Sequence, residues 1–403
     1  MNCGKIVDID ERSALIKYLD EIPYANLLLV DVDNFSNFNN MYGFDFGDRV
    51  LIEISRLIDI SKPALSRVFR INFDEFAIVN LEMLDTKQLS NMAESMISFF
   101  NQIDIDVDDI SVKASISVGI SIGKGNNILN HARTAIKELR EHSRGSSKIY
   151  DSNSEFIKKQ KENVYWINKL RDAFENESLQ PFFQPIINNK TKKIEKYECL
   201  VRIRDEETII SPYRFMEASK LTGTLSLVTR TMIEQSFKMF SNNDYEFSIN
   251  ITNADLYLNY LENFLLKQSR KYNINPSRVV LEILEDIDSL DSPEILLQLN
   301  SLRYHGFKIA IDDFGSRSSN FSRLLEFSPD YLKIDGSFIK NILEDKNSLI
   351  IVESIVFLCK KSNIKIIAEF VHSAEVQAKI EELEIDYSQG YYFGEPKAEV
   401  NYT

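Results

Sequence analysis

Short apolar runs alternate with stretches of helical spacing along the first part of the chain. Residues 26–33 contain the apolar run Leu27–Val30 and end in aspartates, which predicts a buried strand. Residues 68–79 surround a polar turn at 72–75, which predicts a hairpin. Strands alternating with helices predict an α/β or α+β sandwich. The remaining expected elements are a strand at 114–120 and helices near 14–19, 51–58, 92–99 and 128–141.

The second part of the chain repeats one unit several times, an apolar run that ends in a polar residue and is followed by a helical stretch. In the run 196–202, Glu198, Leu200 and Arg202 fall on one face of the expected strand. Repeated strand–helix units of this kind predict a TIM-like (β/α)8 barrel with its site at the carboxyl ends of the strands. The polar residues near the ends of the other runs are Asn250, Glu282, Glu285, Asp312, Asp313, Lys333, Asp335, Glu369 and Gln389.

One of these runs, Phe307–Gly315, ends in two adjacent carboxylates, Asp312 and Asp313. Neighbouring side chains on a regular strand point to opposite faces, so both can serve one site only if the strand ends there. Gly315 permits the turn that would follow. Two like charges that close repel each other unless a cation lies between them, so one interpretation of the pair is a divalent metal site. The alternative is a solvated turn after a strand.

The two parts are joined without a Gly/Pro/Ser-rich linker. Apolar residues such as Ile157, Val164 and Trp166 recur among lysines and glutamates, which predicts a helix that connects two domains. We therefore expect an N-terminal domain at 1–150, a connecting helix at 151–170 and a barrel domain at 171–403.

Composition narrows the possible partners. The 403 residues are 44% hydrophobic and 27% charged, with a formal net charge of -14, which argues against binding to a nucleic acid polymer or an anionic membrane. The three cysteines, Cys3, Cys199 and Cys359, have no metal-site spacing and indicate neither a disulfide framework nor a zinc site. The N-terminus lacks an apolar signal-peptide segment, and no apolar run approaches the roughly 18 residues that span a bilayer. We expect a cytoplasmic protein.

The first part resembles a GGDEF domain, the nucleotidyl-cyclase-like fold that condenses two GTP molecules into cyclic di-GMP. Asp31–Phe35 resembles the metal-binding strand end of that family, and Ser117–Gly119 resembles one of its core strands. The resemblance implies guanine contacts at Asn39 and Asp48 and triphosphate contacts at Arg140 and Arg144. The residues of the implied nucleotide site are Asp31, Asn39, Asp48, Asp74, Arg140 and Arg144.

The signature of that family is changed here. Asn72–Phe76 stands where Gly-Gly-Asp-Glu-Phe is expected, and Phe73 brings a ring into the space that a glycine leaves for phosphates. Pro63 and Ser66 occupy the upstream inhibitory Arg-x-x-Asp positions. We expect no cyclase activity. GTP binding as a regulatory input and a domain kept for packing or dimerisation are both open.

The second part resembles an EAL domain, a phosphodiesterase that linearises cyclic di-GMP, over essentially its full length. Glu198–Arg202 stands for Glu-Ala-Leu-x-Arg, with Cys199 in place of the alanine. The resemblance implies two metal ions with shared ligands. It assigns the first ion to Glu198, Asn250, Glu282 and Asp312, and the second to Asp312, Asp313 and Glu369.

The same resemblance implies the other site roles. Lys333 would hold the attacking water, Gln389 lies in a matching Gln-Gly turn, and Glu285 would anchor the loop after Asp313. With Glu369, these residues form the expected catalytic set. Substrate contacts are assigned to Gln184, Arg202 and Asp335. The ligand set contains oxygen alone, which selects Mg²⁺ or Mn²⁺ over zinc.

The EAL pattern has departures of its own. Phe370 and His372 replace a glycine and a second acid, and Arg317 replaces a glycine in the loop after Asp313. These changes leave the metal ligands whole but bear on the catalytic rate. Phe182, Phe183 and the run Tyr391–Phe393 are expected to be core.

Two readings of the whole chain follow. The first is a metal-dependent phosphodiesterase that converts cyclic di-GMP to linear pGpG, with the first domain as a regulatory or GTP-sensing module. The second is a catalytically weak or silent cyclic di-GMP receptor or scaffold that acts through a protein partner. The resemblance also implies a possible homodimer through the EAL domain.

Overall fold

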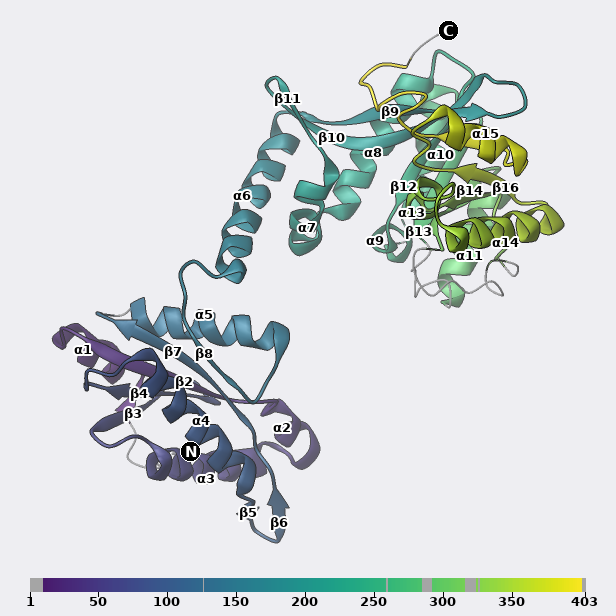
Figure 1. The fold of residues 1–403 in the computed structure, drawn as a ribbon. Coiled ribbons are helices and arrows are strands. Elements are labelled where there is room, and N and C mark those ends of the chain that lie inside the picture. The colour runs from purple at the N-terminus through teal and green to yellow at the C-terminus, as the bar shows by residue number, and fades with distance from the viewer. Residues whose placement is uncertain are drawn as a thin grey trace. The chain divides into compact units, whose positions relative to one another are not determined.

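The computed structural model describes residues 10–125, 127–258, 260–284, 292–315, 324 and 327–400. The chain divides into two compact units, Met1–Lys159 and Gln160–Thr403. Helix α6, Glu155–Glu175, contains the point where the units meet in the sequence (Figure 1). In the described part of the chain, no helix is both long and apolar enough to cross a membrane.

The first unit is a six-stranded sheet in the order β1-β3-β4-β2-β7-β8. Its strands are β1 (Asp10–Glu11), β2 (Ala25–Val32), β3 (Ser66–Arg70), β4 (Glu75–Asn80), β7 (Ile116–Gly123) and β8 (Ser147–Ile149). Its helices are α1 (Arg12–Glu21), α2 (Ser36–Tyr42), α3 (Phe44–Ser61), α4 (Thr86–Gln102) and α5 (Asn127–His142). A separate small hairpin pairs β5 (Ile105–Val107) with β6 (Ile110–Val112). The predicted hairpin is confirmed by the antiparallel pairing of β3 with β4.

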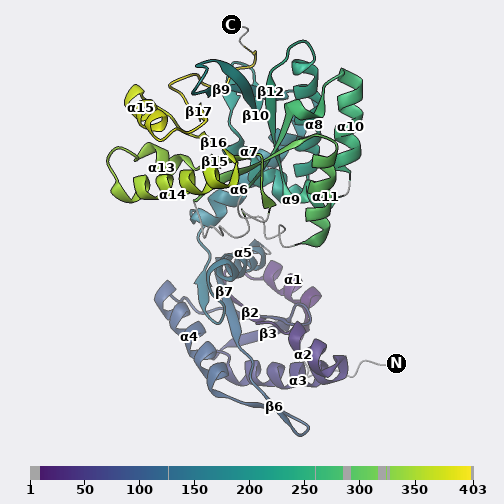
Figure 2. The same ribbon diagram turned by 90° about the vertical axis from the view of Figure 1, so that its right-hand side faces the viewer.

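Helices cover both faces of this sheet (Figure 2). Every residue of the central strand β2 is buried, because its side chains alternate between two cores. Leu27 and Leu29 pack with α1 and α5, whereas Leu28 and Val30 pack with α3 and α4. The α/β sandwich predicted from the alternation of strands and helices is confirmed.

The second unit is a closed barrel wrapped by helices (Figure 1). Its nine-stranded sheet runs β11-β10-β12-β13-β14-β15-β16-β17-β9, and an additional pairing of β9 with β10 closes the ring. The strands are β9 (Leu179–Asn188), β10 (Ile194–Asp205), β11 (Thr208–Ile210), β12 (Glu246–Ile251), β13 (Val279–Leu284), β14 (Lys308–Phe314), β15 (Tyr331–Ile334), β16 (Lys365–Ala368) and β17 (Tyr387–Gln389). The helices are α7 (Pro212–Thr222), α8 (Leu225–Phe240), α9 (Asn253–Tyr257), α10 (Leu261–Tyr272), the 3-10 turn η1 (Pro276–Arg278), α11 (Pro293–Tyr304), α13 (Gly336–Lys340), α14 (Lys346–Ser362) and α15 (Ala374–Glu382).

The barrel departs from the regular (β/α)8 pattern in one strand. From β10 through β12 to β17 the ring is parallel, but β9 runs antiparallel to both β10 and β17. A short connection between β9 and β10 is enough for an antiparallel pair, whereas a parallel pair needs a crossover helix. The TIM-like architecture is confirmed, with this change in direction at its first strand.

The strand ends next to Asp312 and Asp313, as predicted, and Gly315 follows it in a turn with φ +99°. Strand β14 continues to Phe314, and the register with β15 shifts between Ile311 and Phe314. Asp313 has φ +55°, in the left-handed region. An irregularity of this kind turns a side chain away from strict alternation, so adjacent aspartates near the end of the strand can serve one site.

Polar and aromatic side chains lie inside one end of the barrel, beside the apolar Ile186, Val280, Ala310 and Ile367. Lys196 is 4% exposed, and its Nζ lies 2.7 Å from Glu246 Oε1. The same ammonium lies 3.8 Å from the ring centroid of Tyr331 and 3.9 Å from that of Tyr387. Lys308 also pairs with Glu246. These residues occupy the first positions of their strands or lie near them, so they close the amino-terminal end of the barrel.

Candidate active site

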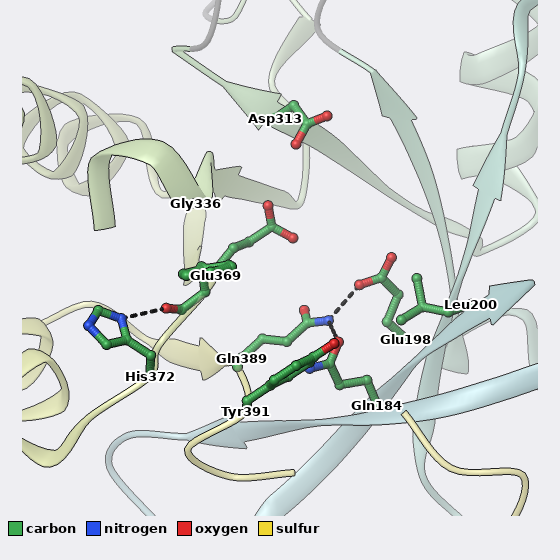
Figure 3. A pocket seen from close by; sticks show the side chains of 11 residues that line it. Gln184, Glu198, Leu200, Asp313, Gly336, Glu369, His372, Gln389 and Tyr391 are labelled. Atoms are coloured by element: carbon green, nitrogen blue, oxygen red, sulfur yellow. Dashed lines mark hydrogen bonds between the residues drawn. The ribbon is translucent and has the colours of Figure 1, made fainter. Parts of the chain in front are cut away.

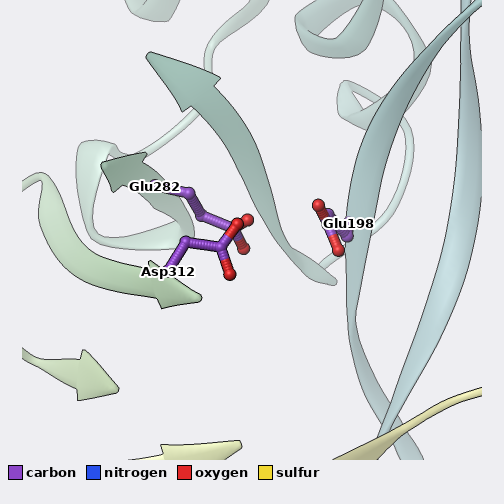
Figure 4. A group of neighbouring side chains, drawn as sticks. All are labelled: Glu198, Glu282 and Asp312. Atoms are coloured by element: carbon purple, nitrogen blue, oxygen red, sulfur yellow. The ribbon is translucent and has the colours of Figure 1, made fainter. Parts of the chain in front are cut away.

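Five carboxylates meet at the carboxyl ends of the barrel strands. Glu198 on β10, Glu282 on β13 and Asp312 on β14 are buried and offer oxygens within 4.8 Å of one another (Figure 4). Asp312 also belongs to a second such group with Asp313 and Glu369. The two groups therefore share Asp312, and each could hold a metal ion.

Lys333, at the centre of this cluster, is 1% exposed. Its Nζ lies 2.9 Å from Glu282 Oε2, 2.9 Å from Glu369 Oε1, 3.0 Å from Asp312 Oδ1 and 3.2 Å from Glu198 Oε2. Burial lowers the pKa of this ammonium, but the surrounding carboxylates outweigh burial and hold the pKa well above its ordinary value. Lys333 is therefore charged and binds the cluster together.

Amide side chains fix the position of Glu198. Asn250 Nδ2 donates to Glu198 Oε1 at 3.0 Å, and Gln389 Nε2 donates to Glu198 Oε2 at 2.6 Å. Gln389 Nε2 also lies 3.1 Å from Gln184 Oε1 (Figure 3). Burial alone would raise the pKa of Glu198, but Lys333 and the two amides hold it below the usual value.

At the other carboxyl groups, the nearby positive charge does not offset the effect of burial on the pKa. Burial, together with neighbouring carboxylates, raises the pKa of Glu369 to about 8 and that of Asp313 to about 6. The same causes raise the pKa of Asp312 and hold that of Glu282 well above its ordinary value. Among the described residues, four of these five carboxylates contact the Lys333 ammonium, and the cluster carries more negative than positive charge.

The donor set fits hard divalent cations. All of the acidic ligands are oxygens, and Glu282 Oε1 is buried without a hydrogen-bond partner among the described residues. An unpaired buried carboxylate oxygen is costly unless a cation binds it. Oxygen ligands of this kind suit magnesium, manganese or calcium better than zinc.

A cavity of about 450 Å³ opens beside the carboxylates. Figure 3 shows Glu198, Gln389 and Gln184 on one side of it and Asp313 on the other. The lining residues are Gln184, Glu198, Leu200, Asp313, Gly336, Glu369, Phe370, His372, Gln389, Gly390 and Tyr391.

Two predicted site residues, Arg202 and Asp335, do not line this cavity. The guanidinium of Arg202 donates to the carbonyl oxygen of Val201 at 2.8 Å and is not among the residues lining this cavity. Asp335 caps helix α13 by accepting a hydrogen bond from the Ser337 amide at 2.7 Å. Its charge still contributes to the raised pKa of Asp313. Glu285 and Arg317 lie outside the described residues.

The aromatic side of the cavity was missed by sequence reasoning. Tyr391 is 66% exposed and lines the cavity, so its assignment to the core is wrong, as it is for Tyr392. Phe182 and Phe183 are buried, as predicted. The Gln389–Gly390 turn carries the next residues past the strand end, so they border the opening rather than the core. The adjacent glycine was the available signal for this turn.

The proposed nucleotide residues of the first unit are only partly gathered. Asp31 is buried, and its Oδ2 lies 2.6 Å from Arg140 Nη2. Burial raises the pKa of Asp31 to about 6 in spite of this pair. Arg144 bonds the Asn34 side chain. Asn39, on α2, packs against Gly47, where an added Cβ would lie 1.9 Å from Asn39 Oδ1.

The changed signature lies at the tip of the β3–β4 hairpin. Phe73 is 77% exposed, and Arg70 donates to its carbonyl oxygen at 3.1 Å. Asp74 follows it and contributes to the raised pKa of Asp31, while Asp48 is exposed on α3. Arg133 Nη2 lies 2.8 Å from Glu75 Oε2. Arginines of α5 thus pair with Asp31 and Glu75, the two carboxylates beside the tip.

Fold and site together define a TIM-like barrel protein with an acidic, oxygen-only site at its mouth. The EAL domain family model matches residues 167–396, more than half of the chain, and the chain belongs to this family. The model described as diguanylate cyclase, GGDEF domain, matches residues 16–146. The tandem arrangement predicted from the motifs is confirmed.

Curated relatives share this arrangement at low identity. The cyclic di-GMP phosphodiesterase PdeB of Shewanella oneidensis is 27% identical over 388 residues, which cover 93% of this chain and 45% of PdeB. The bifunctional diguanylate cyclase/cyclic di-GMP phosphodiesterase MucR of Pseudomonas aeruginosa is 24% identical, over 92% of this chain and 55% of MucR. The chain thus spans about half the length of these relatives.

Solved structures resemble the barrel. The PaMucR phosphodiesterase in complex with c-di-GMP superposes with a TM-score of 0.55 at 25% identity, covering 58% of this chain and 97% of that one. The FimX EAL domain from Pseudomonas aeruginosa bound to c-di-GMP gives a TM-score of 0.55 at 26% identity, over 59% of this chain and 98% of that one.

Proposed function

We propose that the barrel hydrolyses cyclic di-GMP to linear pGpG. One observation carries the proposal: two carboxylate groups that share Asp312 converge on Lys333 at the mouth of an EAL barrel. The relatives named as cyclic di-GMP phosphodiesterases, and the bound dinucleotide in the related structures, support the choice of substrate.

The cluster would hold two Mg²⁺ or Mn²⁺ ions. Glu198, Asn250, Glu282 and Asp312 would bind one, and Asp312, Asp313 and Glu369 the other. Such ions, when bound, polarise the phosphodiester and lower the pKa of a water molecule. The division of the carboxylates into two groups that share Asp312 supports two ions.

The protein's own side chains orient a metal ligand and compensate negative charge. Water adds to one phosphorus of the cyclic dinucleotide, and one phosphorus–oxygen bond breaks to leave a linear product. Lys333 places a fixed positive charge where negative charge accumulates in this step. Gln389 and Asn250 hold Glu198, so a ligand carboxylate is oriented before substrate arrives. Gln184 supports Gln389 from β9.

The direct test is product formation by the full chain. Purified protein is incubated with cyclic di-GMP and Mn²⁺, and linear pGpG is separated by chromatography. Glu198→Ala is expected to abolish turnover. Glu195→Ala is the matched control, because Glu195 bonds Asn188 and Thr191 away from the cluster. Turnover that survives Glu198→Ala would contradict the assigned role of Glu198.

The alternative is a receptor or scaffold that binds cyclic di-GMP without hydrolysis. The retention of all six predicted oxygen ligands, at Glu198, Asn250, Glu282, Asp312, Asp313 and Glu369, favours the enzyme. Binding of cyclic di-GMP without linear product, in the presence of Mn²⁺, would favour the receptor instead.

For the first unit we propose a regulatory or GTP-sensing role without cyclase activity. The pairing of Arg140 with Asp31 and of Arg133 with Glu75 supports this proposal, because arginines already compensate the carboxylates that a catalytic metal would need. Incubation with GTP should yield no cyclic di-GMP, and labelled GTP tests binding. Pairing of two copies through the barrel and a cytoplasmic location stay predictions.

A further inference from the structure

Phe370 combines an unusual backbone conformation with an exposed aromatic ring. It follows Glu369 directly, has φ +57° and is 54% exposed. A bulky aromatic residue at positive φ is an outlier among protein residues. An exposed ring also gains little from burial. Strain of this kind persists where the surrounding structure enforces it, and it gathers at functional sites.

Neighbouring residues hold Phe370 in this conformation. A Cβ added at Gly336 would lie 2.8 Å from Phe370 Cβ, so the ring depends on the absence of a side chain at position 336. The His372 ring nitrogen Nδ1 lies 3.2 Å from the Phe370 carbonyl oxygen. Lys340 Nζ lies 5.8 Å from the ring centroid. The aromatic ring therefore has a defined seat at the cavity.

The cavity that Phe370 lines has two chemically different sides. Glu198, Asp313 and Glu369 supply carboxylate oxygens that, in the proposed function, would hold the metal ions to which the phosphodiester binds. Phe370 and Tyr391, which is 66% exposed, supply aromatic surface to the same cavity of about 450 Å³. A nucleotide has the same two parts, a phosphodiester and a flat base.

We propose that Phe370 is a base-binding residue, whose ring stacks on a purine base of the dinucleotide while the adjacent phosphodiester lies at the carboxylate cluster. This inference rests on the proposed function and deepens it. Aromatic side chains bind bases through their faces, and loss of one such stack weakens binding by about 5- to 150-fold. Phe370 replaces a residue without a side chain in the EAL pattern, so the contact is particular to this chain.

Steady-state kinetics of the full chain with cyclic di-GMP and Mn²⁺ tests the ring. Phe370→Gly removes the ring and suits the positive φ, so the backbone is not strained. We expect KM to rise about 5-fold or more, with kcat within about threefold of the original. Phe370→Trp should keep KM within about threefold. Phe357→Ala is the control, because Phe357 is 66% exposed on α14 and does not line the cavity.

A fluorescence measurement gives an independent readout. The chain has one tryptophan, Trp166, so Phe370→Trp in a Trp166→Phe background places the sole indole at the cavity. Stopped-flow mixing with cyclic di-GMP should quench its emission within the first turnover. An unchanged KM in Phe370→Gly, or an indole that does not respond at saturating ligand, would overturn the inference.

The stacking contact of Phe370 and the phosphodiesterase activity can be disproved separately. Turnover by the unmodified chain with an unaffected Phe370→Gly variant would remove the stacking contact and leave the phosphodiesterase. Quenching without any turnover would remove the phosphodiesterase and leave a base-binding site. Absence of both turnover and binding would remove both.

Discussion

Replacing Lys333 by methionine tests the electrostatics of the cluster. The ammonium is 1% exposed and lies 2.9–3.2 Å from four carboxylates. Methionine keeps the length of the side chain and removes the charge. Breaking a buried ion pair by removing one partner costs about 3–5 kcal/mol, because the other charge is left buried and uncompensated. For a unit of this size, 1 kcal/mol corresponds to roughly 2–4 °C in Tm, so metal-free Lys333→Met should melt about 6–20 °C lower.

The assay is thermal unfolding in a chelator, followed by the emission of Trp166, which packs against the barrel core. Lys308→Met is the matched control. Lys308 is about one-third exposed, and Glu246 keeps Lys196 as a partner when Lys308 is removed. Saturating Mn²⁺ should raise the Tm of Lys333→Met more than that of the unmodified chain, because cations replace the lost charge. A metal-free Lys333→Met that melts within about 2 °C of the unmodified chain would refute the reasoning.

Further predictions concern the backbone and the lower end of the barrel. Gly390→Ala should lower the free energy of unfolding by about 1–3 kcal/mol, because the added Cβ would lie 2.0 Å from the Val371 carbonyl oxygen. It should also lower kcat, because the clash would displace Gln389. Gly394→Ala is the control and should be tolerated, because the atom nearest to its added Cβ lies at 3.2 Å. Urea unfolding and turnover measure the two effects, and a fully active Gly390→Ala would contradict them. Burial lowers the pKa of Lys196 to about 8, so from pH 8 towards 10 the unfolded chain binds more protons and this residue adds stability as pH rises. In Lys196→Met this increase of the unfolding free energy with pH, about 1.4 kcal/mol per pH unit, should be absent. Urea unfolding at several pH values measures the slope, and equal slopes for Lys196→Met and the unmodified chain would contradict the prediction.

The site motifs of the barrel could be predicted from the sequence, because they are defined by residue type and spacing. The recurring polar residues placed Glu198, Glu282 and Asp312 on three strands of one sheet, β10, β13 and β14, and parallel strands deliver their ends to one rim. The antiparallel direction of β9 was not predictable in this way, because an apolar run has no direction. A strand's direction depends on the pairing that closes the ring.

The local backbone geometry of the site could not be predicted from the sequence either. Asp313 and Phe370 both have positive φ, although neither is glycine. Tertiary contacts impose such conformations on residues whose local preference opposes them. The exposure of Tyr391 was not predicted for a related reason. It depends on the course of the chain after Gly390 rather than on the hydrophobicity of the side chain. Sequence patterns predicted which groups meet at the site, and the packing around them decided how they are presented.

Anomalous scattering from a crystal of the full chain soaked with Mn²⁺ tests the central claim most directly. The account predicts two peaks at the barrel mouth, one beside Glu198 and Glu282 and one beside Asp313 and Glu369, with Asp312 between them. A map without peaks there, in a crystal in which these carboxylates face away from one another, would contradict it.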